Sequence, residues 1–180
     1  MRKWYAIYTK HHHENKVALQ LNARSIENYL PISTSLRKWK DRKVWLELPV
    51  FPCYLFIQCE ITEQLHKLRR MRGVISIVGH PMPESVPDYQ IESIRKILSF
   101  DVDWEHFTGF CEGEEVLIVK GPMKGIRGKL MEIRTQNILV VEVELINQGV
   151  TVLVDQRDVM PYNHSGLLPC SVINYYKNTE

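Results

Sequence analysis

The sequence has no apolar run that approaches the roughly 18 residues needed to cross a lipid bilayer. Its opening, MRKWYAIYTK, also lacks the long apolar core and the small-residue cleavage site of a signal peptide. Cysteine is scarce, and Cys53, Cys59, Cys111 and Cys170 form no CxxC pair and no closely spaced framework. This spacing argues against disulfides and against structural zinc. These absences predict a cytoplasmic protein with reduced thiols and no membrane partner.

Motifs for covalent chemistry are absent as well. The sequence contains no GxSxG, no HExxH and no Gly-rich phosphate loop. Cys53 and Cys59 are potential nucleophiles, but both lie within an apolar, strand-like run. We therefore expect a protein that is not an enzyme and has no catalytic residues, cofactor or metal.

Charge is divided unevenly along the chain. Residues 1–100 carry 16 Lys and Arg against 9 Asp and Glu, a net charge of +7, whereas residues 101–180 carry 7 against 12, a net charge of −5. A change of sign on this scale predicts two modules with different partners, the first suited to a polyanion such as nucleic acid. The alternative is an accident of two solvated surfaces.

The first module alternates strand-like and helix-like patterns. Aromatic and β-branched runs predict strands at 3–9, 29–36, 50–59 and 74–78, with a basic hairpin at 37–48 whose tip lies near 40–42. Apolar stripes predict helices at 13–23, at 62–70 and around 91–98. This order predicts an α+β sandwich in which helices cover an antiparallel sheet.

The second module is rich in β patterns. The segment 100–112 has no sustained period and is expected to be a linker, although Trp104, Phe107 and Phe110 could pack. Runs at 114–120, 126–134, 138–146, 150–155 and 158–162 have the spacing of a small barrel. In the third run, apolar residues from Leu139 to Leu145 alternate with Glu142 and Glu144, which predicts a half-buried strand. Residues 163–180 are expected to be a tail.

The stretch GEEVLIVKGPMKGIRGKLMEI, residues 113–133, resembles the KOW motif, in which two strands flank a Gly-Pro turn. Gly121 and Gly125 tolerate a positive φ, Pro122 presets the turn, and Gly128 allows a close approach of backbones. A hairpin of another small barrel is the alternative.

The stretches KWYAIYTK and LPVFPCYLFIQ resemble the two hallmarks of the N-terminal domain of the NusG family. Together with the KOW-like stretch, the likeness covers nearly the whole chain in the right order. It implies a NusG N-terminal domain at 1–99, a linker at 100–112, an SH3-like KOW barrel at 113–162 and a tail at 163–180. WYAIYTK, FPCYLF and MRGVISIVG resemble the specialised RfaH and UpxY paralogues more closely than the housekeeping factor, which commonly has glycine in place of Cys53.

The resemblance implies that the first module binds the clamp helices of RNA polymerase through an apolar depression. The matching positions are Tyr8, Phe51, Pro52, Tyr54, Phe56 and Ile77. Large rigid side chains suit a binding hot spot. Because side chains of a strand alternate between its faces, ordinary core packing is the alternative for each of these residues.

In the specialised paralogues the opposite face contacts the non-template DNA strand. The matching positions are Lys10, His11, Gln20, Arg24 and Arg72. Lys and Arg neutralise phosphates, and Arg and Gln also pair with base edges. A solvated basic face is the alternative.

His11, His12 and His13 are consecutive, which allows three interpretations: a metal site, the remnant of an expression tag, or a polar corner at the DNA surface. Three consecutive rings cannot face one point, and no Asp or Cys accompanies them at ligand spacing. The corner at the DNA surface is the preferred interpretation.

These features predict an antitermination and elongation factor that acts as a monomer and suppresses pausing or termination, with polysaccharide operons as targets by analogy. The KOW module is expected to bind Rho or a ribosomal protein and to remain a barrel, because it is dense in β-branched residues. A general NusG-like elongation factor and a KOW-type RNA-binding or ribosome-associated protein are the alternatives. The acidic second module argues against the RNA binder.

Overall fold

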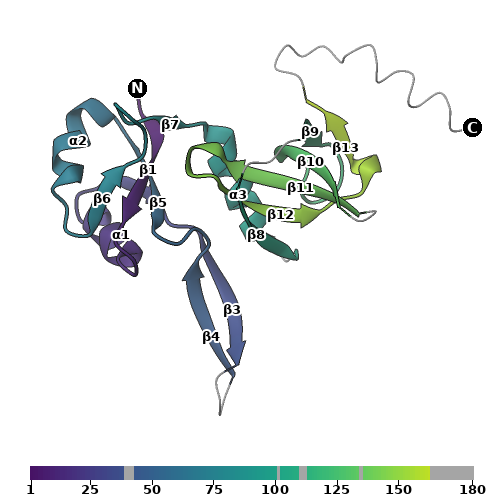
Figure 1. The fold of residues 1–180 in the computed structure, drawn as a ribbon, viewed down its shortest axis with the longest axis horizontal. Helices are drawn as coiled ribbons and strands as arrows, with labels where there is room; N and C mark the ends of the chain where they lie inside the picture. The colour runs from purple at the N-terminus through teal and green to yellow at the C-terminus, as the bar shows by residue number, and fades with distance from the viewer. Residues whose placement is uncertain (39–42, 101, 110–112, 134–135, 163–180) are drawn as a thin grey trace, which may run out of the picture.

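A computed structural model describes residues 1–38, 43–100, 102–109, 113–133 and 136–162. It contains two antiparallel sheets, one on either side of helix α3 (Asp88–Ser99), and a two-stranded hairpin that projects away from both (Figure 1). This is the α+β arrangement expected from the sequence. Within the described part of the chain, no helix is long and apolar enough to span a membrane.

The first sheet has the strand order β2 (Glu27–Tyr29), β5 (Tyr54–Cys59), β1 (Lys3–Thr9), β6 (Val74–Ile77), and β7 (Ser85–Val86) also pairs with β1. Strand β1 is central because it is apolar on both faces, with Trp4 and Ala6 buried on one side and Tyr5 and Ile7 on the other. The strands expected at 3–9 and 74–78 are confirmed.

Helices α1 (Glu14–Asn22) and α2 (Ile61–Arg69) cover one face of this sheet. Val17 and Leu21 of α1 and Leu68 of α2 are fully buried in a cluster with Ile7 and other residues of β1 and β5. Their spacing is the helical stripe that the sequence predicts, so both helices are confirmed to within a residue or two.

The expected strand at 29–36 is divided in two. Strand β2 ends at Tyr29 and β3 (Ile32–Lys38) begins after Pro31, which has no amide hydrogen for a sheet. β3 pairs with β4 (Lys43–Pro49) from Ile32 opposite Pro49 to Lys38 opposite Lys43. The expected tip at 40–42 lies outside the described residues.

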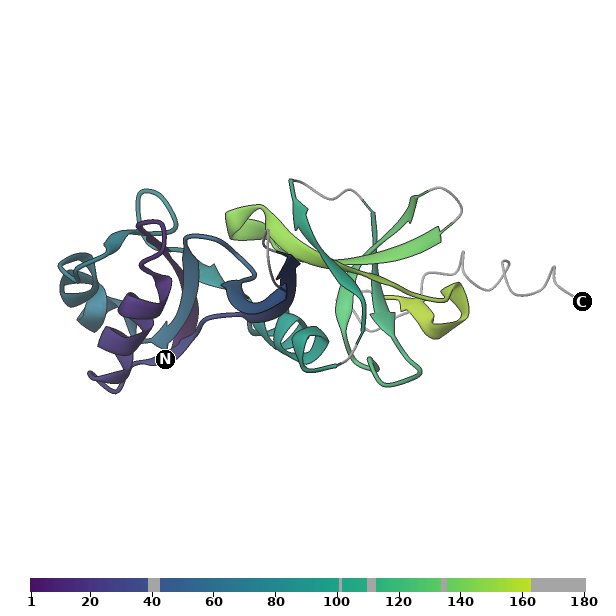
Figure 2. The same ribbon diagram turned by 90° about the horizontal axis from the view of Figure 1, so that it is seen from below.

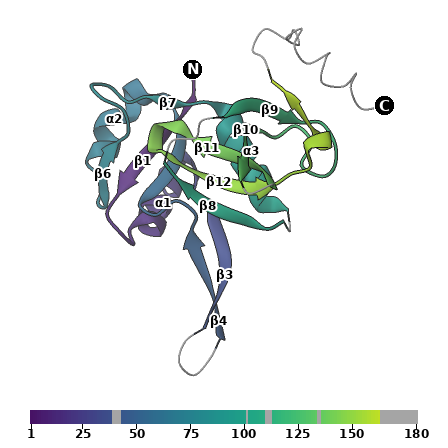
Figure 3. The same ribbon diagram turned by 45° about the vertical axis from the view of Figure 1, so that its right-hand side comes forward.

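Helix α3 lies between the two sheets (Figure 2), and the hairpin of β3 and β4 extends away from both (Figure 3). On one side the Arg95 guanidinium lies over the rings of Trp4, at 5.7 Å, and Tyr29, at 4.7 Å. On the other side Ser93 packs against β10, where its Oγ lies 3.5 Å from the amide nitrogen of Arg127. This position explains why both polar and apolar residues of α3 are buried.

The second sheet has six strands in the order β13 (Val159–Pro161), β9 (Glu114–Ile118), β10 (Arg127–Ile133), β11 (Gln136–Val143), β12 (Gln148–Leu153), β8 (Trp104–Thr108). The sheet curls strongly (Figure 2), and short 3-10 turns, η1 (Glu144–Ile146) and η2 (Gln156–Asp158), precede β12 and β13. This module is β-rich, as expected for a KOW-like domain.

Two expectations for the second module need correction. Residues 104–108 lie in the expected linker but form β8, which pairs with β12 from Trp104 opposite Val152 to Thr108 opposite Gln148. The Trp104 ring packs against the core. This apolar contact stabilises a strand in a segment whose other residues are mostly polar. Strand β11 is buried on both faces, including Val140 and Glu142, because α3 covers the face expected to be solvated.

Candidate functional site

Two tyrosines stand at the end of the β1–β5 pair, on the face of the sheet that also carries Phe56. Tyr8 and Tyr54 are cross-strand partners whose ring centroids lie 5.1 Å apart. Tyr8 is 36% exposed, Tyr54 is partly buried, and Pro52 in the preceding turn is exposed. Burial, with smaller effects of Tyr8 and Cys53, raises the pKa of the Tyr54 hydroxyl, which therefore stays protonated at neutral pH. We call Tyr8, Pro52 and Tyr54 the tyrosine surface.

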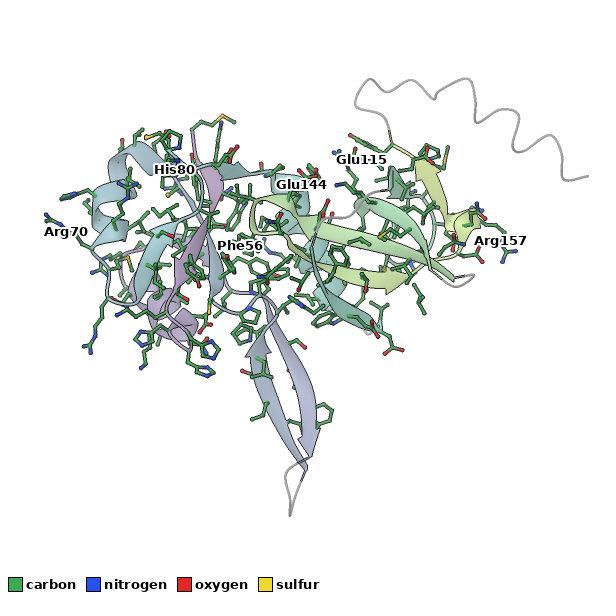
Figure 4. The ribbon with its side chains drawn as sticks, viewed as in Figure 1. Phe56, Arg70, His80, Glu115, Glu144 and Arg157 are labelled. Carbon is green, nitrogen blue, oxygen red and sulfur yellow. The ribbon has the colours of Figure 1, made fainter. Side chains whose placement is uncertain are left out.

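The other three expected polymerase contacts are buried. Phe51 and Phe56 are fully buried and pack edge to face at 6.0 Å. The ring of His106 in β8 lies 6.2 Å from Phe51, and Figure 4 shows Phe56 in the middle of the molecule. Ile77 pairs with Ile7 and lies in the α1 and α2 cluster, on the face opposite Tyr8. Ile77 therefore shares no surface with the tyrosines, and the two phenylalanines lie beneath that surface.

The structure brings four of the expected DNA contacts together on the α1 side of the sheet. Gln20 Nε2 donates to the carbonyl oxygen of Arg72 at 2.9 Å, and Arg24 Nη1 donates to the carbonyl oxygen of Gln20 at 3.0 Å. The Lys10 amide donates to Gly73 at 2.9 Å, next to Arg72. We call Lys10, Gln20, Arg24 and Arg72 the basic surface. Arg70 of the same turn points away from the body (Figure 4).

Gln20 has a structural part in this surface. Its side-chain nitrogen donates both to Arg72 and to the carbonyl oxygen of Lys16, at 3.1 Å. Both amide hydrogens are thus committed to backbone acceptors, and Oε1 is the atom left to contact a ligand. Gln20 holds α1 against the turn that carries Arg72.

His11 follows Lys10 of the basic surface and lies at the corner between β1 and α1. Its Nδ1 lies 3.6 Å from Cys53 Sγ, and the buried Glu14 accepts a hydrogen bond from the Cys53 amide at 2.8 Å. The rings of His11 and His12 lie 3.8 Å apart, whereas His13 packs beside Gly73. Sequence spacing could not reveal this corner, because Cys53 reaches it through the pairing of β1 with β5.

The thiol at this corner is not activated as a nucleophile. Burial, followed by the nearby Glu14 carboxylate, raises the pKa of Cys53, so the thiol is protonated at neutral pH. Burial also raises the pKa of Cys59 to about 11. Neither Cys53 nor Cys59 forms a disulfide.

The Gly-Pro turn between β9 and β10 has the backbone that its sequence predicts. Gly121 and Gly125 have φ of +73° and +88°, and Pro122 lies between them in an exposed position. A Cβ on Gly128 would lie 2.5 Å from the carbonyl oxygen of Val140. Glycine is therefore needed at position 128 for close packing of β10 on β11.

A polar junction between α3 and the second sheet was not expected from the sequence. The Arg127 guanidinium lies between the rings of Tyr89, at 4.0 Å, and Tyr162, at 3.6 Å. Nearby, Lys129 pairs with the buried Glu142. Burial lowers the pKa of Lys129, but hydrogen bonds and charges of the neighbouring glutamates outweigh it and leave the pKa raised. Arg127 and Lys129 lie in β10, and Glu142 lies in β11 on the face that its sequence predicts to be solvated.

Comparison with known proteins identifies the first module. The family model described as "Transcription termination factor nusG" matches residues 2–95, just over half of the chain. The chain belongs to the NusG family. NusG of Thermotoga maritima, in a solved structure titled for its domain interaction, has a TM-score of 0.46 and 23% identity, covering 91% of this chain and 98% of that one. A search of curated proteins gives no significant match.

Membership of the NusG family identifies a transcription elongation or antitermination factor, a class that interacts with RNA polymerase and is not enzymatic. The family match ends at residue 95, within α3. The tyrosine surface and the basic surface both lie in the matched region.

Proposed function

We propose that this NusG-family chain is a specialised antitermination factor, similar in action to RfaH and UpxY proteins. It docks on the clamp helices of RNA polymerase through the tyrosine surface and contacts the non-template DNA strand through the basic surface. The observation that carries the proposal is the placement of these two surfaces on opposite faces of one sheet. A factor built in this way can hold protein on one side and single-stranded DNA on the other.

The tyrosine surface has the properties of a protein-binding hot spot. Tyr8 and Pro52 are exposed and Tyr54 is partly buried, next to a rigid core formed by Phe51 and Phe56. Tyrosine buries a large area on binding and loses little conformational entropy. Pausing is suppressed in this proposal because the docked factor holds the closed form of the polymerase.

The basic surface has the properties of a single-strand contact. Arg24 and Arg72 are exposed, and Gln20 contacts both. The Arg24 guanidinium donates to the carbonyl oxygen of Gln20, and the Gln20 side chain donates to the carbonyl oxygen of Arg72. Lys10 adds a third exposed cation, and His11 and His12 border the surface with exposed rings. Cations supply phosphate contacts and exposed rings supply stacking, which together suit splayed bases.

For the second module we propose a KOW-like unit that begins at β8, ends at residue 162 and follows an N-terminal unit of residues 1–99. It is acidic overall, which favours a protein partner over RNA. Rho and a ribosomal protein are the two partners that the family resemblance offers, and polysaccharide-type operons are the targets offered by UpxY proteins.

A transcription elongation assay on a long template tests the proposal. Wild type is expected to shorten pauses, and Tyr54→Ala to abolish this effect on every template. Leu153→Ala is the matched control, since it removes an exposed apolar side chain from the second module. Equal loss with both variants would contradict docking through the tyrosine surface.

Arg24→Ala/Arg72→Ala tests the second contact in the same assay. Loss of activity is expected only on templates that carry the recruiting DNA element. Lys120→Ala/Arg157→Ala removes the same charge from exposed positions in the second module and should have no effect. Uniform loss across templates would favour a general NusG-like elongation factor, and no effect of wild type on any template would favour an RNA-binding protein.

A further inference from the structure

Three side chains with metal-binding atoms converge at the corner between β1 and α1. One potential ligand atom from each of His11, Glu14 and Cys53 lies within 4.8 Å of the other two. Of these atoms, His11 Nδ1 and Cys53 Sγ lie 3.6 Å apart. In a tetrahedral site with bonds of about 2.0–2.3 Å, ligand atoms lie about 3.3–3.8 Å apart, so small side-chain rotations would close the site.

The backbone around this corner is fixed by hydrogen bonds. The Cys53 carbonyl oxygen accepts from the Thr9 amide at 2.8 Å and from the Thr9 hydroxyl at 3.2 Å. The Cys53 amide donates to Glu14 Oε1 at 2.8 Å, which leaves Oε2 without a hydrogen-bond donor among the described residues. The Cys53 backbone and the Glu14 carboxylate are therefore held in place before any ion arrives, and only side-chain rotation remains to complete the site.

Cys53 also occupies an unfavourable backbone position. Its φ is +68°, a left-handed value that glycine adopts freely and that costs other residues about 1–2 kcal/mol. Strain of this kind gathers at functional sites.

We propose that His11, Glu14 and Cys53 bind one transition-metal ion of the zinc type. An imidazole nitrogen, a carboxylate oxygen and a thiolate sulfur are the three ligand types that Zn²⁺ takes from proteins, and the sulfur selects against Mg²⁺ and Ca²⁺. Glu14 is 4% exposed and His11 is exposed, so the fourth position faces solvent and takes a water molecule. The ion would join two segments about 40 residues apart, between the tyrosine surface and the basic surface.

From the sequence we expected no metal at the histidines, whereas this proposal makes His11 a ligand. His12 and His13 take no part, in agreement with the argument that three consecutive rings cannot face one point. The thiol ligand is Cys53, which directly precedes Tyr54. Because Tyr54 pairs with Tyr8 of β1, Cys53 is brought next to the corner that follows β1. The proposal does not depend on the transcriptional function.

Titration of the full chain with Co²⁺ tests the site, because a thiolate bound to Co²⁺ gives a charge-transfer absorption. A Cys111→Ser/Cys170→Ser background restricts the thiols to Cys53 and Cys59. One Co²⁺ per chain with a thiolate band is expected, and Zn²⁺ should displace it. His11→Ala should weaken binding by about tenfold or more. His66→Ala, an exposed histidine on α2, is the matched control and should bind normally.

Cys53→Gly separates loss of the ligand from loss of the fold. Glycine suits φ of +68°, so this variant should be at least as stable as wild type without metal. Zn²⁺ is expected to raise the melting temperature of wild type and not that of Cys53→Gly. Absence of a thiolate band with excess Co²⁺, or a band that persists in Cys53→Gly, would overturn the proposal and leave a hydrogen bond between His11 and Cys53.

Discussion

The ring of His106 in β8 lies 6.2 Å from the ring of Phe51 in the turn before β5. A strand of the second sheet thus covers a fully buried residue of the turn that leads into the first sheet. The apolar core continues across this contact, from Trp4 and Phe56 through α3 to Val141 and Val150. If the proposed docking through the tyrosine surface is right, a change at Phe51 beneath that surface affects both stability and docking.

Phe51→Ala is expected to destabilise the protein by about 3–5 kcal/mol, because it leaves a cavity beneath both sheets. Urea unfolding followed by tryptophan fluorescence measures the loss. His106→Ala, at an exposed position over the same ring, should cost less than about 1 kcal/mol. Any loss of polymerase binding in Phe51→Ala reflects this destabilisation, so Tyr54→Ala is the cleaner test of docking.

Two glycine substitutions should differ in cost for steric reasons. Gly128→Ala would bring a Cβ to 2.5 Å from the Val140 carbonyl oxygen, and separating β10 from β11 is expected to cost about 2–3 kcal/mol. Gly121→Ala meets no atom within 4 Å and pays only for its φ of +73°, about 1 kcal/mol. Chemical denaturation of both variants checks the order, and an equal cost would contradict the close approach at Gly128.

The Lys129 and Glu142 pair is expected to behave as a buried ion pair. Lys129→Met leaves the carboxylate of Glu142, which is 7% exposed, without its partner, and should cost about 2–3 kcal/mol. Lys129→Met/Glu142→Leu should recover most of this loss, because no buried charge remains. A double variant less stable than the single one would show that the pair itself stabilises the sheet.

The raised pKa of Tyr29 predicts that the protein loses stability at alkaline pH. Burial raises its pKa from 10.0 to about 12, against a smaller opposing effect of Arg95. The folded state holds the phenolic proton more tightly than the unfolded state, so this contribution is complete below about pH 10 and is lost between about pH 10 and pH 12, by about 1.4 kcal/mol per pH unit. Unfolding free energies of wild type and Tyr29→Phe across this range check it. Cys59 titrates in both proteins, so the difference between them isolates Tyr29.

Binding of single-stranded DNA should depend on salt through the basic surface. For each of Lys10, Arg24 and Arg72 changed to alanine, the slope of log affinity against log salt should fall by about 0.7. Fluorescence anisotropy with a labelled oligonucleotide at several salt concentrations measures this slope. A drop in affinity with an unchanged slope would mean that the residue supports the fold and does not contact phosphate.

Sequence patterns predicted the helices, strands and turns that depend only on residues close together in the sequence. The helical stripe of Ile91, Ile94 and Ile97 and the apolar run of β1 depend only on spacing, and both are where the sequence indicates. The backbone of the turn at Gly121 and Gly125 is equally local. These features need no knowledge of a distant partner.

The features that sequence reasoning missed depend on contacts between distant segments. The alternation in β11 predicts a solvated face for Glu142, but α3 packs against β11 and Lys129 pairs with the carboxylate, so that Glu142 is 7% exposed. Likewise, the spacing of Cys53 from His11 hides a separation of 3.6 Å that β1 and β5 create by pairing. The face of the sheet on which Ile77 lies depends on the register of β6 against β1, in which Ile77 pairs with Ile7. The sequence alone does not give this register.

The position of α3 between the sheets has a consequence for any attempt to divide the chain. Tyr89 and Ser93 of this helix contact Arg127 of β10, while Arg95 contacts Trp4 and Tyr29 of the first sheet. A fragment that stops at residue 99 would keep the helix and lose the surface that covers half of it. We expect such a fragment to associate with itself through the uncovered side of α3, so the full chain is the form in which binding constants should be measured.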